Sequence, residues 1–292
     1  MILHLAIAPD NLDVLRLVLA RQKRPNAVIV CVGASRTRRV LDAAGLTPNL
    51  LISPPLGSPV IGYPRMRKIA QTYPQPLRVI VWSDRAQTWA QWLWPGFRID
   101  NAMQTPIDPS LLDLAESLQN DTDPDQTRAA WQARAGSSPE TPFIGLLTDH
   151  AEAARTLTFA SAMAVYCETH DLRGPATPKL VIDPELTDRP AIEGLWTRDD
   201  VQNVLLQEPD WLWPWRRLPA LDAAIVPAGA REPGLLCSLA LQAGCPVALE
   251  VKRPDRVPDD LKHHPQLRIT PEGAPKPLAE ALLDLVPYPS LS

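Results

Sequence analysis

The chain has 292 residues, of which 45% are hydrophobic and 21% charged, and its formal net charge is −4. These proportions are ordinary for a globular protein, and a prior of roughly 150 residues per domain suggests two domains. A weakly acidic chain lacks the basic footprint of a nucleic-acid-binding protein, so we expect no nucleic-acid partner.

The first residues, MILHLAIAP, are too short and lack the positive flank of a signal peptide, so we interpret them as a β-strand. No run approaches the roughly 18 apolar residues of a membrane span. We therefore expect a cytoplasmic protein without a transmembrane segment. The cysteines show neither a CxxC pair nor a histidine spacing suited to zinc, which predicts buried, reduced thiols and no metal site. They are Cys31, Cys167, Cys237 and Cys245.

Short apolar runs alternate with helical periodicity through the first half of the chain. The pattern predicts strands at 2–8, 27–33, 50–52 and 77–82, with helices at 12–20, 37–44 and 64–73. His4, inside the first strand, is expected to be a buried structural residue. Alternation of this kind is typical of a parallel, doubly wound sheet.

A polar stretch at 120–142 interrupts the alternation, and a second series follows it. Strands are predicted at 143–148, 179–182, 223–227 and 247–251, and helices at 152–170 and 234–243. The sequence thus predicts an α/β protein with two Rossmann-like domains whose parallel sheets face each other across a cleft. The expected boundaries are 1–119 for the first domain, 120–142 for a linker, and 143–292 for the second domain.

Residues 218–251, LPALDAAIVPAGAREPGLLCSLALQAGCPVALEV, resemble the C-terminal half-site of GT-B glycosyltransferases of the GT4 type. In that family a strand leads through a loop with a Glu, a GxGL-like turn and a helix with a second Glu to A-G-x-P-V. Gly234-Leu235 matches the turn, and Ala243-Gly244-Cys245-Pro246-Val247 matches the end of the helix and the next strand. The likeness is specific over this segment alone. It implies a nucleotide-sugar donor in the second domain, an acceptor-side first domain, a glycan or lipid acceptor, and no metal or other cofactor.

The two acids of the family motif are not retained. We align the family motif with this chain at Gly234 and at Gly244-Cys245-Pro246. The sugar-proximal Glu of the motif then aligns with Arg231, and its ribose-binding Glu aligns with Leu239. Glu232 is one position away from Arg231. A carboxylate accepts hydrogen bonds from hydroxyls, whereas Leu239 has no polar group and Arg231 is only a donor. Two hypotheses follow: a divergent glycosyltransferase that moves a sugar from a nucleotide diphosphate to an unknown acceptor, or an inactive GT-B protein that binds or scaffolds. Leu239→Glu would then tighten UDP or GDP binding, provided the helix presents this position to the cleft.

Other donor-binding candidates lie near the predicted helix start. The amides of Gly234 and Leu235 would favour an anion there, while Glu232 is either part of the site or a helix cap. In the family, a basic residue near the start of the helix after 143–148 contacts the donor diphosphate. Arg155 could take this role or be a solvated helix residue.

Cleft candidates follow from the rule that ligands of open α/β sheets bind beyond the carboxyl ends of strands. Asp84 follows the strand at 77–82, and Asp149 and His150 follow the strand at 143–148. Two tryptophan groups are further candidates for core packing, ring stacking or, where exposed, an interface. They are Trp89, Trp92 and Trp94, and Trp211, Trp213 and Trp215.

Overall fold

The computed structural model describes residues 1–9, 11–33, 35–53, 59–102, 109–120, 122–147, 162, 165–170, 178–182, 204–206, 216–230, 232–253, 257 and 259–286. The chain divides into two compact units, Met1–Leu114 and Ala115–Ser292. Within the described ranges, no helix has the length and apolar character needed to cross a bilayer.

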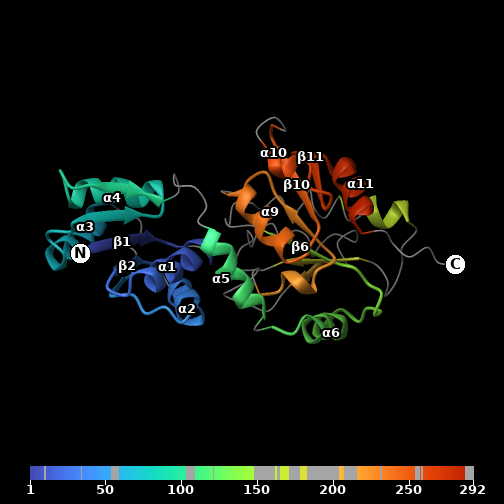
Figure 1. Ribbon diagram of the computed structural model, residues 1–292, viewed down its shortest axis with the longest axis horizontal. Helices are drawn as coiled ribbons and strands as arrows, with labels where there is room; N and C mark the ends of the chain where they lie inside the picture. Colours follow the sequence, from blue (N-terminus) through green and yellow to red (C-terminus); the bar gives the residue numbers. More distant parts are fainter. Residues whose placement is uncertain are drawn as a thin grey trace. The chain divides into compact units, whose positions relative to one another are not determined.

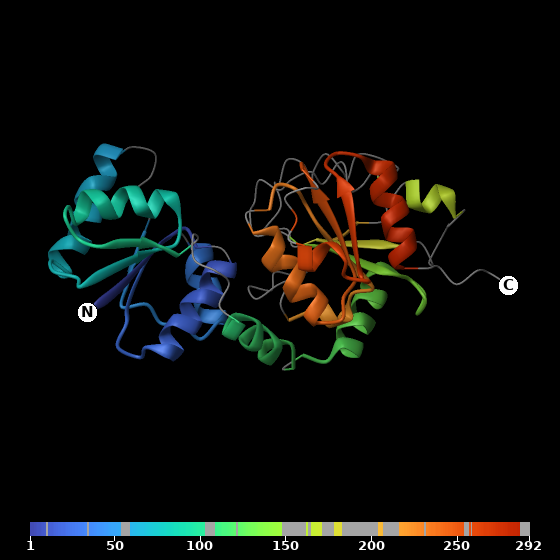
Figure 2. The ribbon, with the colours of Figure 1, turned by 45° about the horizontal axis from the view of Figure 1, so that its top comes forward.

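The first unit is built on a five-stranded parallel sheet in the order β3-β2-β1-β4-β5. Figure 2 shows α3 and α4 on one face of this sheet and α1 and α2 on the other. Helix α5 (Pro109–Asn120) follows the last strand. The strands are β1 (Ile2–Ile7), β2 (Val28–Val32), β3 (Leu50–Ile52), β4 (Arg78–Val81) and β5 (Ile99–Asn101), and the helices are α1 (Asn11–Lys23), α2 (Ser35–Ala43), α3 (Pro59–Thr72) and α4 (Asp84–Leu93).

The two faces of the first sheet follow from strand alternation, because successive side chains point to opposite faces. Leu3 and Leu5 pack in one core cluster with Val79, Val81 and residues of α3 and α4. His4, between the two leucines, belongs to the opposite face and is buried as predicted. The core of the first unit therefore lies on both faces of β1, the central strand.

The second unit is built on a six-stranded parallel sheet in the order β11-β10-β9-β6-β7-β8. Counted within the unit, this is the 3-2-1-4-5-6 order of doubly wound dinucleotide-binding sheets. Figure 1 shows α9 and α11 on opposite sides of β10. The strands are β6 (Phe143–Leu146), β7 (Lys179–Ile182), β8 (Val204–Leu206), β9 (Ala223–Val226), β10 (Val247–Val251) and β11 (Leu267–Pro271), and the helices are α6 (Pro124–Ala135), η4 (Leu218–Ala220), α9 (Pro233–Gln242), α10 (Asp259–Lys262) and α11 (Pro275–Leu285).

The prediction of two Rossmann-like α/β units with parallel sheets is confirmed. Several elements were not predicted from the sequence: strands β5, β8 and β11, and helices α4, α5, α6, η4, α10 and α11. Strands β5 and β8 have three residues each, too few for an alternating pattern to stand out. Most of the helix predicted at 152–170 lies outside the described residues, and 165–170 is helical apart from its last residue.

Helix α6 occupies most of the polar stretch at 120–142, so the assignment of a linker to this stretch stays a prediction. Capping residues mark both ends of α6. Asp123 Oδ1 accepts hydrogen bonds from the amides of Asp125 (3.0 Å) and Gln126 (3.2 Å) at the start. Gly136, with φ 59°, ends the helix in the left-handed conformation that glycine adopts without strain.

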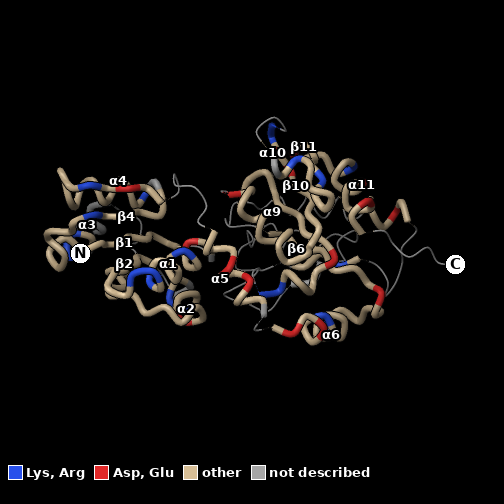
Figure 3. Tube along the Cα trace, viewed as in Figure 1, with Lys and Arg blue, Asp and Glu red and all other residues tan. Residues whose placement is uncertain are grey.

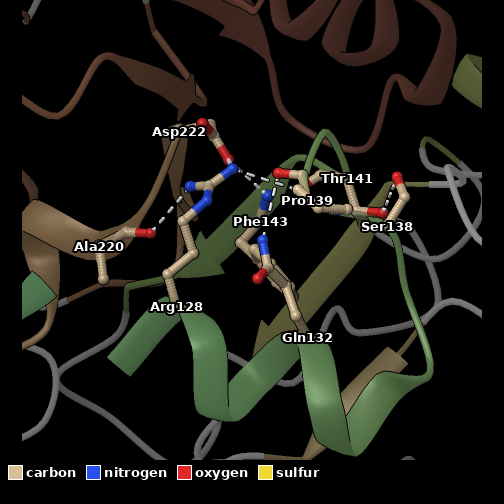
Figure 4. Close-up of polar contacts among 8 residues, drawn as sticks. All are labelled: Arg128, Gln132, Ser138, Pro139, Thr141, Phe143, Ala220 and Asp222. Carbon is tan, nitrogen blue, oxygen red and sulfur yellow. Dashed lines mark hydrogen bonds and ion pairs between the residues drawn. The ribbon is translucent and has the colours of Figure 1, made fainter. Parts of the chain in front are cut away.

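Arg128 joins α6 to the strand starts of the second unit (Figure 4). Its Nη2 lies 2.8 Å from Asp222 Oδ2 and donates to the Thr141 carbonyl (3.1 Å). Nη1 donates to the Ala220 carbonyl (3.3 Å), and the guanidinium lies 5.3 Å from the centre of the Phe143 ring. Asp222 Oδ2 also accepts from the Phe143 amide (2.7 Å). We call these contacts of Arg128 the Arg128 clamp. They tie α6 to the amino ends of β6 and β9.

Replacing Arg128 by Ala is expected to lower the free energy of unfolding by about 2 kcal/mol, because the half-buried carboxylate of Asp222 loses its charged partner. Urea denaturation measures the change. The matched control is Arg134→Ala on the same helix, where an exposed arginine should contribute less than about 0.5 kcal/mol. Equal losses in both variants would show that the Arg128 contacts do not stabilise the unit.

Candidate functional site

A pocket of about 500 Å³ opens at the carboxyl ends of β9 and β10. These strands are parallel neighbours, so the loops that follow them meet at one edge of the sheet. Ligands of open α/β sheets bind at this edge, and the volume lies within the usual range of roughly 300–1,000 Å³ for small-molecule sites. The pocket is lined by Ala228, Pro233, Gly234, Leu249, Glu250, Val251, Lys252, Arg253, Val257 and Leu261.

Helix α9 points its amino end at this pocket. The chain leaves β9 at Pro227, turns through a hydrogen bond from the Ala230 amide to the Pro227 carbonyl (3.0 Å), and enters the helix at Pro233. The first helical bond runs from the Leu236 amide to the Glu232 carbonyl (3.1 Å). Amides in the first turn have no carbonyl one turn earlier, so this end of the helix attracts anions.

Glycine at 234 keeps this wall of the pocket open. A Cβ built there would find Leu261 Cδ1 at 4.0 Å as its nearest neighbour, so packing does not demand a glycine. Ser238, one turn later, donates through Oγ to the Gly234 carbonyl (3.0 Å). A larger side chain at 234 would therefore extend into the pocket and leave the helix intact.

Two cations and one carboxylate line the pocket at the end of β10. Lys252 and Arg253 are exposed, whereas the side chain of Glu250 is fully buried. Glu250 Oε1 accepts from the Gly273 amide (3.3 Å), and the Glu272 amide donates to the Val251 carbonyl (3.0 Å). The turn after β11 thus fixes the end of β10, and the two cations that follow are presented to solvent at the pocket rim.

The predicted donor-binding residues have different positions around α9. Gly234 lines the pocket, and Leu235 is buried in the first turn of the helix. Glu232 is the residue before the helix, but its side chain makes no capping hydrogen bond with the helix amides. Leu239 is fully buried, so the condition that the helix presents position 239 to the cleft is not met in this structure.

Other candidates lie outside the described residues: Arg155, Arg231, Asp149, His150 and the tryptophans at 211, 213 and 215. Asp84 is the first residue of α4, after a cap in which Ser83 Oγ accepts from the Ala86 amide (3.1 Å), and its side chain is not described. In the other tryptophan group, Trp94 is buried and Trp92 is exposed.

The cysteines do not supply a nucleophile. All four are free thiols, and burial raises the pKa of Cys237, on α9, to about 12. Burial likewise raises the pKa of Cys31 to about 12, that of Cys167 to about 11, and that of Cys245 further still. Since the thiolate is the reactive form, these thiols are inert at neutral pH. Among the described residues, no cluster of metal-binding side chains is found.

The sequence analysis missed Glu250, Lys252 and Arg253, although a signal for them exists. The predicted strand at 247–251 is apolar except for Glu250, and two cations follow it directly. The rule that selects residues just beyond a strand picks out Lys252 and Arg253 as readily as it picks out Asp149. The motif resemblance drew attention to α9 instead.

Comparisons with known proteins connect this architecture to solved structures. No family model matches the chain, and no curated protein sequence matches it. The glycosyltransferase WaaG, involved in lipopolysaccharide biosynthesis, is similar with a TM-score of 0.62 at 13% identity, over 98% of this chain and 90% of that chain. UDP-GlcNAc 2-epimerase from Neisseria meningitidis, solved with UDP-GlcNAc, gives a TM-score of 0.56 at 14% identity, over 99% of this chain and 92% of that chain.

A third similar structure is the complex of S. aureus MnaA with UDP, with a TM-score of 0.59 at 13% identity, over 98% of this chain and 88% of that chain. Similarity at such identities speaks for the fold alone. It agrees with an architecture of two units, each built on a parallel sheet. The chain therefore has a GT-B-like double Rossmann α/β fold.

Proposed function

We propose that this chain binds a nucleoside diphosphate sugar in the pocket between α9 and the end of β10, and that it transfers the sugar to an acceptor. The observation that carries the proposal is the pocket itself. It combines a helix amino end, two cations and an apolar wall at the carboxyl edge of a 3-2-1-4-5-6 sheet. Proteins of the same fold have been solved with UDP-GlcNAc and with UDP.

The chemistry of the pocket suits the two parts of such a ligand. A diphosphate would lie against the first-turn amides of α9 and within reach of Arg253, since guanidinium groups pair well with phosphate oxygens. Leu249, Val257 and Leu261 provide an apolar wall for the face of a base or a sugar ring. The carboxylate of Glu250 is fully buried and accepts from the Gly273 amide, so its part in this arrangement is to hold the end of β10 in place rather than to contact the sugar.

A second candidate function is nucleotide-sugar binding without turnover. The buried Leu239 favours it, because the motif register places the ribose-binding acid of the GT4-type enzymes at this position. Loss of that acid removes one or two charge-assisted hydrogen bonds, each contributing about 1.5–3 kcal/mol. Weak binding with no reaction would then be the outcome.

One experiment separates these functions and a third, epimerisation. UDP-, GDP- and ADP-sugars are first ranked by the rise they cause in melting temperature, because a ligand selective for the native state stabilises it. The best ligand is then incubated with protein and followed by NMR. Release of the nucleoside diphosphate together with the sugar passed to water, the only acceptor present, indicates glycosyl transfer. Conversion to a stereoisomeric sugar that is still attached to the nucleotide indicates epimerisation, and an unchanged ligand that still stabilises the protein indicates binding alone.

Arg253→Gln is expected to weaken binding of the selected nucleotide by about tenfold or more, because one charge-assisted hydrogen bond to phosphate is lost. Gly234→Leu should weaken binding by filling the pocket, with no loss of melting temperature. Calorimetry gives both dissociation constants. Arg134→Gln, the same chemical change on α6, is the control and should bind like the wild type. Unchanged affinity in both pocket variants would place the nucleotide elsewhere.

A further inference from the structure

Four large apolar side chains are exposed within the described ranges, and all four lie in the first unit. Leu77 is 76% exposed and Trp92 63%, and Met1 and Phe97 are also exposed. Single exposed apolar residues are common, but several in one place mark a binding surface. Trp92 also belongs to the tryptophan group that is predicted to mark an interface where it is exposed.

Three of these residues precede neighbouring strands of one sheet. Met1 precedes β1, Leu77 precedes β4, and Phe97 lies two residues before β5, and these strands are adjacent and parallel. The Leu77 amide donates to the Met1 carbonyl (2.9 Å), which fixes the first two side by side. The three residues therefore lie together at the amino edge of the sheet.

Trp92 belongs to the same edge. It lies in the last turn of α4, and the turn that follows is closed by a hydrogen bond from the Phe97 amide to the Trp94 carbonyl (3.2 Å). Trp94 itself is buried and donates through Nε1 to the Tyr73 carbonyl (2.8 Å), which holds the end of α4 against the end of α3. We call Met1, Leu77, Trp92 and Phe97 the amino-edge patch.

Basic residues border the amino-edge patch. Arg98 follows Phe97 with its side chain 71% exposed, and the exposed Lys68 lies in the last two turns of α3. Arg24 follows α1 and lines a pocket of about 400 Å³ that also contains Met1. Figure 3 shows Lys and Arg positions, in blue, near the start of the chain. One of these cations, Arg98, shares an ion pair with Asp100, which also pairs with Arg78.

We propose that the amino-edge patch docks the protein onto an anionic membrane surface. Tryptophan favours the headgroup level of a bilayer, and leucine and phenylalanine beside it add apolar area that enters the interface. The bordering cations attract acidic headgroups, and each Lys or Arg near such a surface raises affinity about fivefold. A second copy fits this face poorly, because a two-fold dimer pairs the same patch with itself and brings like charges together.

Vesicle flotation of the full chain tests the proposal. Wild type is expected to float with vesicles of phosphatidylcholine containing about one third phosphatidylglycerol, and to float far less with phosphatidylcholine alone or at high salt. Leu77→Ser/Trp92→Ser should lower the bound fraction about tenfold. Arg24→Glu/Lys68→Glu should lower binding to the anionic vesicles at least about 25-fold.

The control Arg134→Glu/Lys276→Glu makes the same change in net charge on exposed positions of the second unit, and it should leave flotation within about twofold of wild type. Melting curves verify that each variant is folded. The proposal is overturned if wild type stays out of the anionic vesicle fraction, or if the control lowers flotation as much as the patch variants. It is also overturned if light scattering shows that the apolar variant dissociates a dimer while its flotation is unchanged. Nucleotide affinity is not part of these readouts, so the result is independent of the donor site.

Discussion

Leu239→Glu is expected to destabilise the protein by at least about 4 kcal/mol rather than to restore a ribose contact. Leu239 is fully buried on α9, which packs against β9 and β10. A carboxylate at this position would lie in the apolar interior without solvent. Urea denaturation gives the free energy of unfolding, and calorimetry with UDP gives the affinity of any variant that stays folded.

Leu239→Met is the matched control, since an apolar side chain of similar volume should change stability by less than about 1.5 kcal/mol. A Glu variant that is as stable as wild type and binds UDP more tightly would contradict the structure. It would mean that α9 presents position 239 to the ligand, as the motif register alone suggests.

Acid is expected to destabilise the protein through His4. Burial, together with the charges of Arg24, Arg21 and Arg78, lowers the pKa of His4 from 6.5 to about 4. Neither ring nitrogen has a hydrogen-bond partner among the described residues, and the ring stacks on Trp82 at 5.9 Å. The folded state therefore keeps His4 neutral down to about pH 4, whereas the unfolded state takes up a proton near pH 6.5.

This difference in pKa between the folded and unfolded states sets how the free energy of unfolding depends on pH. Between pH 6.5 and about 4 the unfolded state binds more protons, so the free energy of unfolding falls as the pH falls. The full contribution is about 3 kcal/mol between pH 7.5 and pH 4. His4→Leu should remove it, which flattens the curve of unfolding free energy against pH by this amount. His170→Leu, on an exposed histidine outside the first unit, is the control. Parallel curves for wild type and His4→Leu would show that His4 is protonated in the folded state.

The core strands could be predicted from sequence for a simple reason. In a parallel sheet covered on both faces, strands such as β2 and β9 are continuous apolar runs that stand out from their surroundings. Strand β5, with the sequence IDN, is short and partly polar, and nothing in its composition separates it from a loop. Helix α6 has a weak apolar stripe, since Thr127 and Trp131 are its buried residues, and its polar composition resembles that of a linker.

The candidate site could be predicted only in part. The motif resemblance directed attention to Gly234, which lines the pocket, because a glycine turn before a helix is a local feature. The orientation of Leu239 depends on how α9 rotates against β9 and β10, which no local pattern fixes. Lys252 and Arg253 become part of the pocket because β10 lies beside β9, a pairing between segments separated by a helix.

The Arg128 clamp limits how the chain can be dissected into fragments. A fragment that begins at Ser137, after α6, would contain every described strand of the second sheet, yet it would leave out α6. Asp222 would then keep its hydrogen bond from the Phe143 amide but lose its ion pair with Arg128. The Phe143 ring would lose its contact with the ring of Trp131, whose centre lies 5.4 Å away. The resulting exposed aromatic face and uncompensated charge would favour aggregation. Expression of the second unit alone therefore requires a start at or before Asp123, the residue that caps α6.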